Sequence, residues 1–314
     1  MKREIGLDAI TPNENAVVTV GTFDGVHRGH QAILRYLTQR ARQRDGTSTV
    51  VSFDPHPRQV VHGDPVALLT TIDERAALLE AYGLERFVVI PFTKEFAQLR
   101  PEAYVEEILL RRVGLKEIVI GYDHRFGRNR EGDRELLERM GEAHAFSVDV
   151  IPPQEVDHDI VSSSAVRDLL TEDGDVQRAT EMLGHPYALQ GTVEQGEGRG
   201  RKLGYPTANI AVGDARKLIP KIGVYAVRAR VGDTEPTYGG MMNIGRRPTF
   251  DGMDVTAEVH LLGFEGSIYG ERLRVEFLQR LRDEQKFDSV DALVAQLSRD
   301  EEHCRTVLNA TKAA

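Results

Sequence analysis

The sequence is poor in cysteine, in positive charge and in long apolar runs, and each shortage excludes a class of protein. Cys304 is the single cysteine among 314 residues, so no disulfide forms within the chain. The formal net charge of -9 argues against a nucleic-acid-binding protein, whose phosphate contacts need a basic face. No apolar run approaches the roughly 20 residues of a membrane span, and the start Met1-Lys2-Arg3-Glu4 lacks the apolar core of a secretory signal. We therefore expect a soluble cytoplasmic protein.

Alternation of strand and helix patterns predicts an α/β domain in the first part of the chain. At about 150 residues per domain, 314 residues suggest two domains. Up to about residue 184, short apolar runs alternate with helical patterns, which predicts a Rossmann-like parallel sheet with its ligand crevice at the carboxyl ends of the strands. The capping box of Thr71 and Glu74 marks one helix start, and Pro101 marks another. The expected strands are 16–20, 49–53, 86–91, 117–121 and 147–151.

From about residue 185 the pattern changes to short, glycine-rich β runs. Six such runs separated by turn residues predict a closed or nearly closed antiparallel six-stranded barrel. The expected strands are 187–194, 204–210, 223–231, 237–244, 255–262 and 273–281. A terminal helix at 289–306 should pack on the barrel through Val290, Leu293, Leu297, Cys304 and Leu308. The two predicted domains are therefore residues 1–184 and 185–314.

The segment 20–30, VGTFDGVHRGH, joins the first expected strand to a helix of about residues 29–42. His27 and His30 stand at the start of that helix, where unpaired backbone N–H groups and the helix dipole favour an anion. The imidazoles add two donors aimed at one phosphate. The HxGH pattern resembles the nucleotidyltransferase signature, in which the histidines stabilise charge on an α-phosphate while pyrophosphate leaves. An ordinary helix cap, or half of a zinc site with Asp24 as a further ligand, is the alternative.

A second motif, VSSSAVR at 161–167, predicts another helix start. Serine is a favoured N-cap residue, and Arg167 follows in the first turn. By itself the motif indicates a capped helix with a surface arginine. Beside HxGH, it resembles the ISSTxIR element of the same nucleotidyltransferases, which supplies positive charge for the β- and γ-phosphates.

The third motif, GEGRGRKLGYPTANI at 196–210, interleaves four glycines with three cations. Such a loop brings the backbone close to phosphates while arginine and lysine neutralise their charge. Thr207 and Asn209 alternate on the expected strand, so both side-chain oxygens point the same way. Two neutral oxygens, with phosphate oxygens and water, suit Mg²⁺. A flexible basic surface loop is the alternative, and it explains the glycines but not the PTAN sequence.

With these motifs, the chain resembles the bacterial bifunctional riboflavin kinase/FAD synthetase (FMN adenylyltransferase) family over nearly its whole length. Five further stretches stand in the family's order. One departure is His124, where the family usually has phenylalanine. The stretches are FDPHP at 53–57, GYDHRFG at 121–127, GVYAV at 223–227, NIGRRPTF at 243–250 and EVHLL at 258–262.

The resemblance implies two ATP-dependent reactions in two domains, with Mg²⁺ accompanying ATP. The C-terminal barrel would phosphorylate riboflavin to FMN, and the N-terminal domain would transfer AMP from ATP to FMN, giving FAD and pyrophosphate. In the second reaction His27, His30 and Arg167 would stabilise charge without a protein nucleophile. In the first, Glu258 would be the general base for the riboflavin 5′-hydroxyl. Thr207 and Asn209 would be the metal ligands.

The resemblance also implies contacts to ATP or flavin in most of the motifs. Without it, Asp123 would be a turn cap, Phe53 and His56 would be core and turn residues, and Glu258 would face solvent. The expected contact residues are Gly21, Phe23, Asp24, Gly29, Phe53, His56, Asp123, Ser163, Ser164, Gly198, Arg199, Lys202, Gly204, Pro206, Thr207, Asn209 and Asn243.

Three other kinds of protein share part of this pattern. A flavin sensor without activity would have no reason to keep Thr207, Asn209 and Glu258 together with HxGH. An aminoacyl-tRNA synthetase fragment would need a KMSKS-like partner motif and a basic RNA surface. An enzyme with one degenerate domain and a single activity stays open. We expect ATP and flavins as partners, with no nucleic acid and no membrane, and the sequence predicts no oligomeric state.

Overall fold

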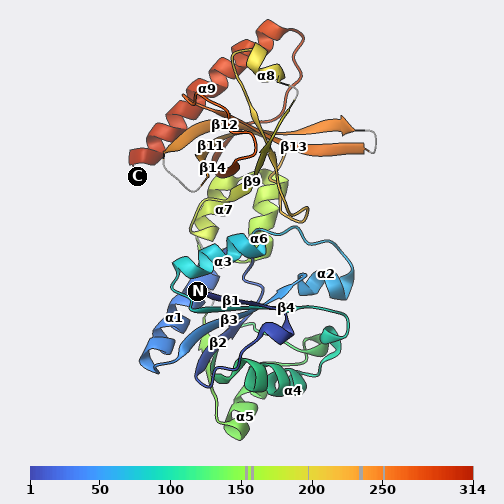
Figure 1. Cartoon of the computed structure of the whole chain (residues 1–314), viewed down its shortest axis with the longest axis vertical. Coiled ribbons are helices and arrows are strands. Elements are labelled where there is room, and N and C mark those ends of the chain that lie inside the picture. The colour runs from blue at the N-terminus through green and yellow to red at the C-terminus, as the bar shows by residue number, and fades with distance from the viewer. Residues whose placement is uncertain (153–154, 157–158, 197, 233–235, 250–251, 314) are drawn as a thin grey trace. The chain divides into compact units, whose positions relative to one another are not determined.

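The computed structural model describes residues 1–152, 155–156, 159–196, 198–232, 236–249 and 252–313. The chain forms two compact units, Met1–Ser163 and Ser164–Ala314, whose helices and strands are labelled in Figure 1. Among the described residues, no helix combines the length and the apolar character needed to cross a membrane.

The first unit is built on a six-stranded sheet in which every neighbouring pair is parallel, as predicted. After β2, the chain adds β3 and β4 on one side and then returns to place β5 on the other side, so the order reverses beside β2. Such a switch point opens a ligand crevice at the carboxyl ends of the strands. The spatial order is β1 (Lys2–Ile5), β4 (Arg86–Pro91), β3 (Thr47–Asp54), β2 (Ala16–Val20), β5 (Leu115–Gly121) and β6 (Ser147–Ile151).

Helices cover both faces of this sheet because alternate strand residues point to opposite sides. Val17 lies in a core cluster with residues of α1 and α3, whereas Val18 lies in a second cluster with residues of η4 and α5. All five predicted strands are present, and all but the edge strand at 147–151 are buried on both faces, as is typical of parallel strands. The helices are α1 (Arg28–Gln43), α3 (Ile72–Ala81), α4 (Pro101–Ala103) continuing as the π-helical η4 (Tyr104–Val113), and α5 (Arg134–His144).

The helix starts predicted from capping residues are confirmed. Thr71 Oγ1 accepts a hydrogen bond from the Glu74 backbone N–H, and the Glu74 carboxylate accepts one from the Thr71 N–H. Pro101 opens α4, and Gly114 ends η4 with a φ of 86°. Short elements complete the unit: η1 (Leu7–Ala9), η2 (Asp24–Val26), α2 (Pro57–His62), η3 (Phe96–Gln98), η5 (Arg128–Arg130), β7 (Glu155–Val156) and β8 (Asp159–Ile160).

The second unit contains the predicted closed barrel of six strands, with only antiparallel pairs. Three helical segments precede the barrel, and α7 packs on β14. The strands in barrel order are β10 (Ala208–Ala211), β13 (Gly252–Leu261), β12 (Thr237–Thr249), β11 (Gly223–Val231), β14 (Arg272–Arg282) and β9 (Ala188–Glu194). The helices are α6 (Ser163–Asp168), η6 (Leu169–Asp173), α7 (Val176–Leu183) and α8 (Arg199–Lys202).

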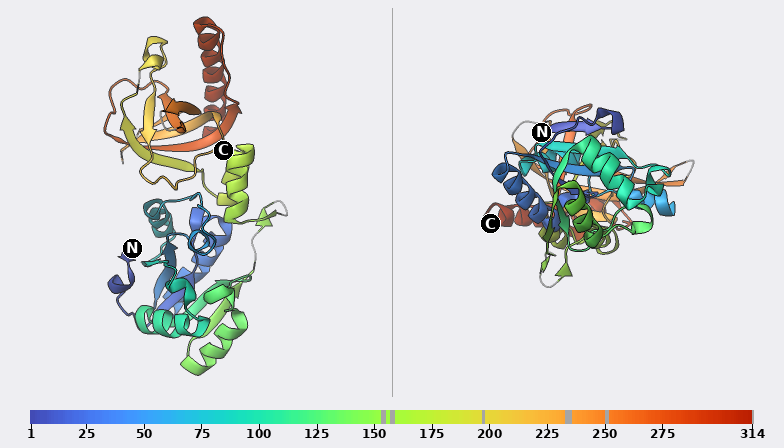
Figure 2. Two further views of the ribbon diagram at one scale, coloured as in Figure 1. Left: turned by 90° about the vertical axis from the view of Figure 1, so that its right-hand side faces the viewer. Right: turned by 90° about the horizontal axis from the view of Figure 1, so that it is seen from below.

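The terminal helix α9 (Val290–Ala313) packs on the outer face of the barrel, as predicted (Figure 2). Cys304 is fully buried in a cluster with Ala226 and Met241 of the strands, and its thiol donates to the Gly240 carbonyl. The prediction for Val290 is wrong, since that side chain is 61% exposed. It is the first residue of α9 and lies outside the cluster that joins this helix to the barrel strands.

Candidate functional site

The chain turns sharply between β2 and α1, in the segment that carries HxGH. Phe23, Gly25 and Val26 have φ values of 50°, 80° and 42°, so three of four successive residues are in the left-handed region. This region is strained for a β-branched residue such as Val26 and persists only where surrounding contacts hold it. We call residues 23–26 the corner turn.

The two predicted histidines stack on each other at the start of α1. Their ring centroids are 3.6 Å apart and the planes differ by 18°. His27 is the N-cap residue, and its Nδ1 accepts a hydrogen bond of 3.4 Å from the His30 N–H. A Cβ at Gly29 would lie 3.1 Å from the His27 ring, which explains the glycine of HxGH. Phe23 packs on the other side of His30, with centroids 4.6 Å apart.

Burial, together with His27 and Arg75, lowers the pKa of His30 well below its ordinary value. His30 is therefore neutral at pH 7 and carries a hydrogen on only one ring nitrogen. Its Nδ1 is buried and has no hydrogen-bond partner among the described residues. A neutral ring supplies one N–H donor and no positive charge.

The carboxylate of Asp24 is completely buried, and both of its oxygens accept hydrogen bonds from the chain. Oδ2 accepts from the Leu69 N–H at 3.0 Å, and Oδ1 accepts from the Thr70 N–H at 2.9 Å. The hydroxyl of Thr70 and the guanidinium of Arg75 also donate to Oδ1. Asp24 therefore ties the corner turn to the segment before α3, and in the described part of the chain no three His, Cys, Asp or Glu residues gather as a metal site.

The serine motif reaches the corner turn through Ser163, whose hydroxyl donates to the Asp24 carbonyl at 2.9 Å. Ser163 begins α6, as the motif predicted, and Ser164 is exposed. Arg167 is half-buried on α6 and belongs to the second unit. Its action beside the histidines stays a prediction.

Aromatic rings lie near the carboxyl ends of β3, β4 and β5. Phe53 contacts Phe92 and Phe96, with centroids 5.3 and 6.0 Å away. His124 stacks on Phe126 at 5.7 Å, and its burial lowers its pKa to about 4. The histidine that departs from the family pattern is thus a neutral aromatic ring at pH 7. His56 caps α2 by accepting from the Arg58 N–H, and Asp123 is exposed.

In the barrel, the polar residues predicted for the second site form one cross-strand row. Glu258 on β13 lies directly opposite Asn209 on β10 and opposite Asn243 on β12. Residues opposite each other in a sheet share a face. The hydroxyl of Thr207 donates to Glu258 Oε2 at 3.1 Å. All four side chains are partly exposed, so a ligand can reach them.

The glycine-rich loop fits closely around this row. A Cβ at Gly196 would lie 2.1 Å from Asn209 Nδ2, and one at Gly200 would lie 2.2 Å from the Tyr205 carbonyl. Gly198 and Gly204 have φ values of 67° and 82°, which other residues rarely adopt. The Pro206 carbonyl accepts from the His260 ring. Lys202 is exposed, and the side chain of Arg199 lies outside the described residues, as do those of 247–250.

Sequence reasoning missed Arg75, which is 2% exposed and bonded to Asp24. A signal was present: Arg75 stands in the first turn of α3, where the helix dipole disfavours a cation. A polar residue in an unfavourable local position indicates a constraint from elsewhere in the fold.

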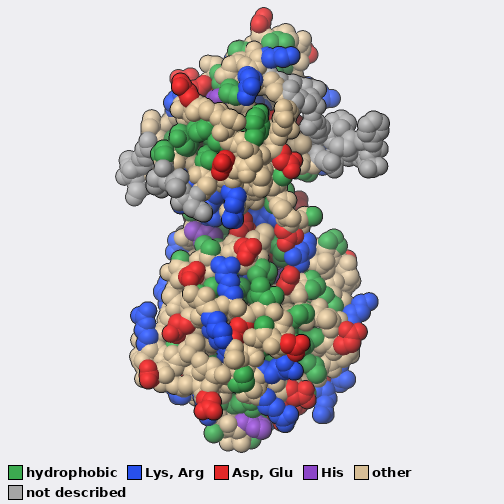
Figure 3. Space-filling view, viewed as in Figure 1, with side chains coloured by type: hydrophobic (Ala, Val, Ile, Leu, Met, Phe, Trp, Pro, Cys, Tyr) green, Lys and Arg blue, Asp and Glu red, His purple; other side chains and the backbone are tan. Residues whose placement is uncertain are grey.

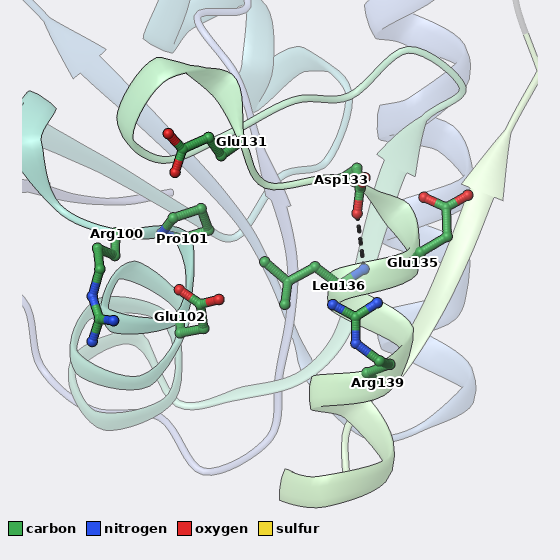
Figure 4. A pocket seen from close by; sticks show the side chains of 8 residues that line it. All are labelled: Arg100, Pro101, Glu102, Glu131, Asp133, Glu135, Leu136 and Arg139. Atoms are coloured by element: carbon green, nitrogen blue, oxygen red, sulfur yellow. Dashed lines mark hydrogen bonds between the residues drawn. The ribbon is translucent and has the colours of Figure 1, made fainter.

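A surface pocket of about 340 Å³ lies between the starts of α4 and α5, and none of the predicted site residues is among those that line it (Figure 4). Asp133 at its rim caps α5 by accepting from the Leu136 N–H. This hydrogen bond and Arg125 hold the pKa of Asp133 below its ordinary value. The lining residues are Arg100, Pro101, Glu102, Glu131, Asp133, Glu135, Leu136 and Arg139. On the face drawn in Figure 3, cationic and anionic side chains are interspersed over the first unit.

Comparison with known proteins gives two family matches, one in each part of the chain. The FAD synthetase family matches residues 9–165, and the riboflavin kinase family matches residues 183–308.

Curated relatives match nearly the whole chain. The bifunctional riboflavin kinase/FMN adenylyltransferase of Listeria monocytogenes is 38% identical over 93% of this chain and 92% of its own length. The protein of the same name from Escherichia coli is 37% identical over 96% of each chain. A crystal structure from Streptococcus pneumoniae, described as a macrolide-efflux protein, is 33% identical with a TM-score of 0.88, covering 97% of this chain and 99% of that one.

Proposed function

The chain belongs to the bifunctional riboflavin kinase/FMN adenylyltransferase family, and from this premise we propose how its residues divide the two reactions. The enzyme phosphorylates riboflavin with ATP to give FMN, and it transfers AMP from ATP to FMN to give FAD and pyrophosphate. The observation that carries the division is that each unit holds its own set of site residues. The stacked histidines lie in the first unit, and the Glu258 row lies in the second.

In the first unit, the start of α1 receives the phosphates of ATP. An oxygen of the FMN phosphate attacks the α-phosphorus, the bond to the pyrophosphate oxygen breaks, and no protein nucleophile is required. His27 and His30 donate hydrogen bonds to the charge that develops there. Because His30 is neutral, positive charge at the start of α1 comes from the helix dipole. Ser163 lines the same nucleotide site, and Phe53, His56 and Asp123 contact the flavin or the nucleotide.

In the second unit, Glu258 orients the riboflavin 5′-hydroxyl and accepts its proton as the oxygen attacks the γ-phosphorus. Thr207 Oγ1 lies 3.1 Å from Glu258 Oε2, so the proposed metal ligand and the proposed base are adjacent. The neutral oxygens of Thr207 and Asn209 fit Mg²⁺, which keeps water and phosphate oxygens as its other ligands and would neutralise charge on ATP. Lys202, Arg199 and the loop glycines Gly198 and Gly204 surround the phosphates, and Asn243 supports the row.

We propose that the functional boundary lies near residue 184, between domains of residues 1–184 and 185–314. The riboflavin kinase match begins at residue 183, which supports this boundary, while the compact units divide at Ser163. We also propose that the enzyme works in the cytoplasm on small molecules and binds no nucleic acid. The net charge of -9 supports the last point.

The test is to give the purified protein either riboflavin or FMN with ATP and Mg²⁺ and to separate the flavin products. The proposal predicts FMN and then FAD from riboflavin, and FAD directly from FMN. Formation of FAD from FMN without any conversion of riboflavin would instead indicate a degenerate barrel. Conversion of riboflavin to FMN alone would indicate a degenerate first unit.

A further inference from the structure

Arg75 is a buried cation that forms hydrogen bonds to the corner turn and to two neighbouring segments of the chain. Its guanidinium donates to Asp24 Oδ1 at 3.2 Å, to the Thr70 carbonyl at 3.0 Å, and to the Thr70 hydroxyl at 3.3 Å. It also donates to Ser52 Oγ at 3.4 Å. A buried charge is stable only when such partners satisfy it. The guanidinium therefore fixes three chain segments against one another: the end of β3, the corner turn and the segment before α3.

Each partner of Arg75 in turn holds part of the corner turn. The Thr70 hydroxyl donates to Asp24 and accepts from the Gly25 N–H at 3.0 Å. The Ser52 hydroxyl donates to the Thr22 carbonyl at 3.1 Å. Thr22, just before the corner turn, and Asp24 and Gly25 within it are thus tied to groups that Arg75 contacts. Strain of this kind relaxes when the contacts that impose it are removed.

We propose that Arg75 is a positioning residue for adenylyl transfer, holding the corner turn so that His27 and His30 face the reacting phosphate. The proposal rests on the proposed function of the first unit, because it concerns the geometry of that site. Arg75 touches neither ATP nor FMN in this account. Its effect reaches the histidines through Asp24, Thr70 and the backbone of residues 23–26.

Arg75 also acts on His30 through its charge. Burial lowers the pKa of His30 most, and the two titratable or charged groups that act on it, His27 and Arg75, lower it further. Loss of the cation raises that pKa, so His30 becomes protonated at a higher pH than in the wild type. Substitution of a residue with a purely structural role elsewhere in the unit would not shift the acidic limb of the curve that relates the kcat of FAD formation to pH.

The experiment compares Arg75→Met and Arg75→Lys with the wild type in the full chain. For Arg75→Met we expect the kcat of FAD formation from FMN to fall about 100-fold, the scale of a displacement of about 1 Å at a reacting centre. FMN formation from riboflavin should stay within about twofold, and the acidic limb of the adenylylation profile should move to higher pH. Arg75→Lys keeps the positive charge but not the planar guanidinium. Its kcat of FAD formation should therefore fall, while the acidic limb of its pH profile should stay at the wild-type pH.

Arg86 provides a matched control, because it is also a buried arginine paired with a carboxylate, 2.7 Å from Glu4. Arg86→Met removes a buried ion pair from the same unit without touching the corner turn. It should lower the unfolding temperature but leave both the adenylylation kcat and the acidic limb close to the wild type. A loss of adenylylation in Arg86→Met as large as in Arg75→Met would overturn the positioning role.

A double-mutant cycle keeps the proposal testable if Arg75→Met folds poorly. Asp24→Asn with Arg75→Met leaves no unpaired buried charge, and because both residues act through one network, their losses in kcat should not multiply. Multiplying losses, or Arg75 variants within threefold of the wild-type kcat, would contradict the proposal. If the wild type itself made no FAD from FMN, the proposed function would fail instead.

Discussion

The amide of Asn209 lies so close to Gly196 that any larger residue at 196 would displace it. The separation from a Cβ there to Nδ2 would be 2.1 Å, well inside van der Waals contact. Since the obstacle is the end of a side chain and not backbone, the fold can accommodate the change by moving the amide. The absence of a side chain at Gly196 therefore lets Asn209, the proposed metal ligand, keep its position.

For Gly196→Ala we predict that FMN formation falls by about 10- to 100-fold, as for other displacements near 1 Å, while the unfolding temperature changes little. Gly213→Ala is the control, because nothing lies within 4 Å of a Cβ at Gly213. Initial rates of FMN formation at several Mg²⁺ and ATP concentrations measure the effect. Equal kinase rates in the two variants would remove Asn209 from the metal site.

Removal of the charge of Glu258 tests its role as the base. Glu258→Gln should reduce FMN formation by about 10²- to 10⁴-fold, the usual contribution of a general base. FAD formation from supplied FMN should be unchanged. Glu276→Gln is a matched change on β14, where the carboxylate pairs with Arg274 outside the polar row. Normal riboflavin phosphorylation by folded Glu258→Gln would show that another group takes the proton.

The lowered pKa of His124, a half-buried histidine, predicts how stability depends on pH. Its pKa is lowered from 6.5 to about 4, chiefly by burial and also by Arg130, against the opposite effect of Asp123. The unfolded chain therefore binds a proton near pH 6.5 that the folded chain does not bind until about pH 4. Stability is full above pH 6.5 and falls as the pH is lowered towards 4, by on the order of 3 kcal/mol.

His124→Phe should flatten this fall in stability, with part of it remaining because the pKa of His30 is lowered too. Urea midpoints measured between pH 7 and pH 4 give the slope. His62→Phe replaces an exposed histidine and should keep the wild-type slope. If His124→Phe kept the full slope, the ring of His124 would be protonated in the folded protein.

The site residues that were predicted lie in short sequence motifs, whereas the one that was missed depends on a partner far away in the sequence. Thr207, Asn209 and Glu258 were predicted from motifs, and the barrel brings them together. Arg75 was missed because its site partner Asp24 is 51 residues away and carries no pattern that points to it. Such a pair becomes visible only when the fold places both residues in one buried space.

Among the elements, those with strong local signals were predicted well. The capping box of α3 and the apolar strands of the sheet follow from spacing alone. Strand β1 was not expected, since only one of its four residues is buried and it pairs with a strand more than 80 residues away. The left-handed corner turn was not expected either, because Phe23 and Val26 are residues that rarely adopt a positive φ.

The capping box of α3 is predicted to stabilise the first unit. Thr71→Ala removes the acceptor for the Glu74 N–H and should cost about 1 kcal/mol of unfolding free energy. Chemical denaturation of the wild type and the variant measures this difference in unfolding free energy. Thr306→Ala, in the middle of α9, is the control and should not destabilise the protein. A loss in Thr306→Ala equal to that in Thr71→Ala would argue against a specific cap.

At the scale of the whole molecule, the second compact unit starts earlier than the riboflavin kinase match. Helix α7 packs on β14, and its residues Val176, Ala179 and Met182 are at most 4% exposed. Each large apolar side chain buried in this way stabilises a fold by roughly 1.5–3 kcal/mol. The segment before the barrel is therefore expected to support the barrel itself.

We predict that a fragment of residues 164–314 folds and phosphorylates riboflavin, because it retains α7 and the whole polar row. A fragment of residues 185–314 should be active but less stable, with a lower urea midpoint. Circular dichroism and FMN formation compare the two. Equal stability of both fragments would place the structural boundary near residue 184, and folded but inactive fragments would show that the kinase site needs the first unit.

We propose that two separate sites in one chain act in succession on the flavin. Glu258→Gln and His30→Ala each remove one proposed site, so neither variant should convert riboflavin to FAD alone. His30→Ala should accumulate FMN, with adenylylation reduced by about 10²- to 10³-fold, as for the loss of one transition-state donor.

The most direct measurement mixes the two variants with riboflavin, ATP and Mg²⁺ and follows FAD over time. The account predicts that the mixture makes FAD, because FMN released by His30→Ala is adenylylated by Glu258→Gln. A mixture that accumulates FMN without FAD, or a Glu258→Gln protein that has lost both activities, would contradict two independent sites.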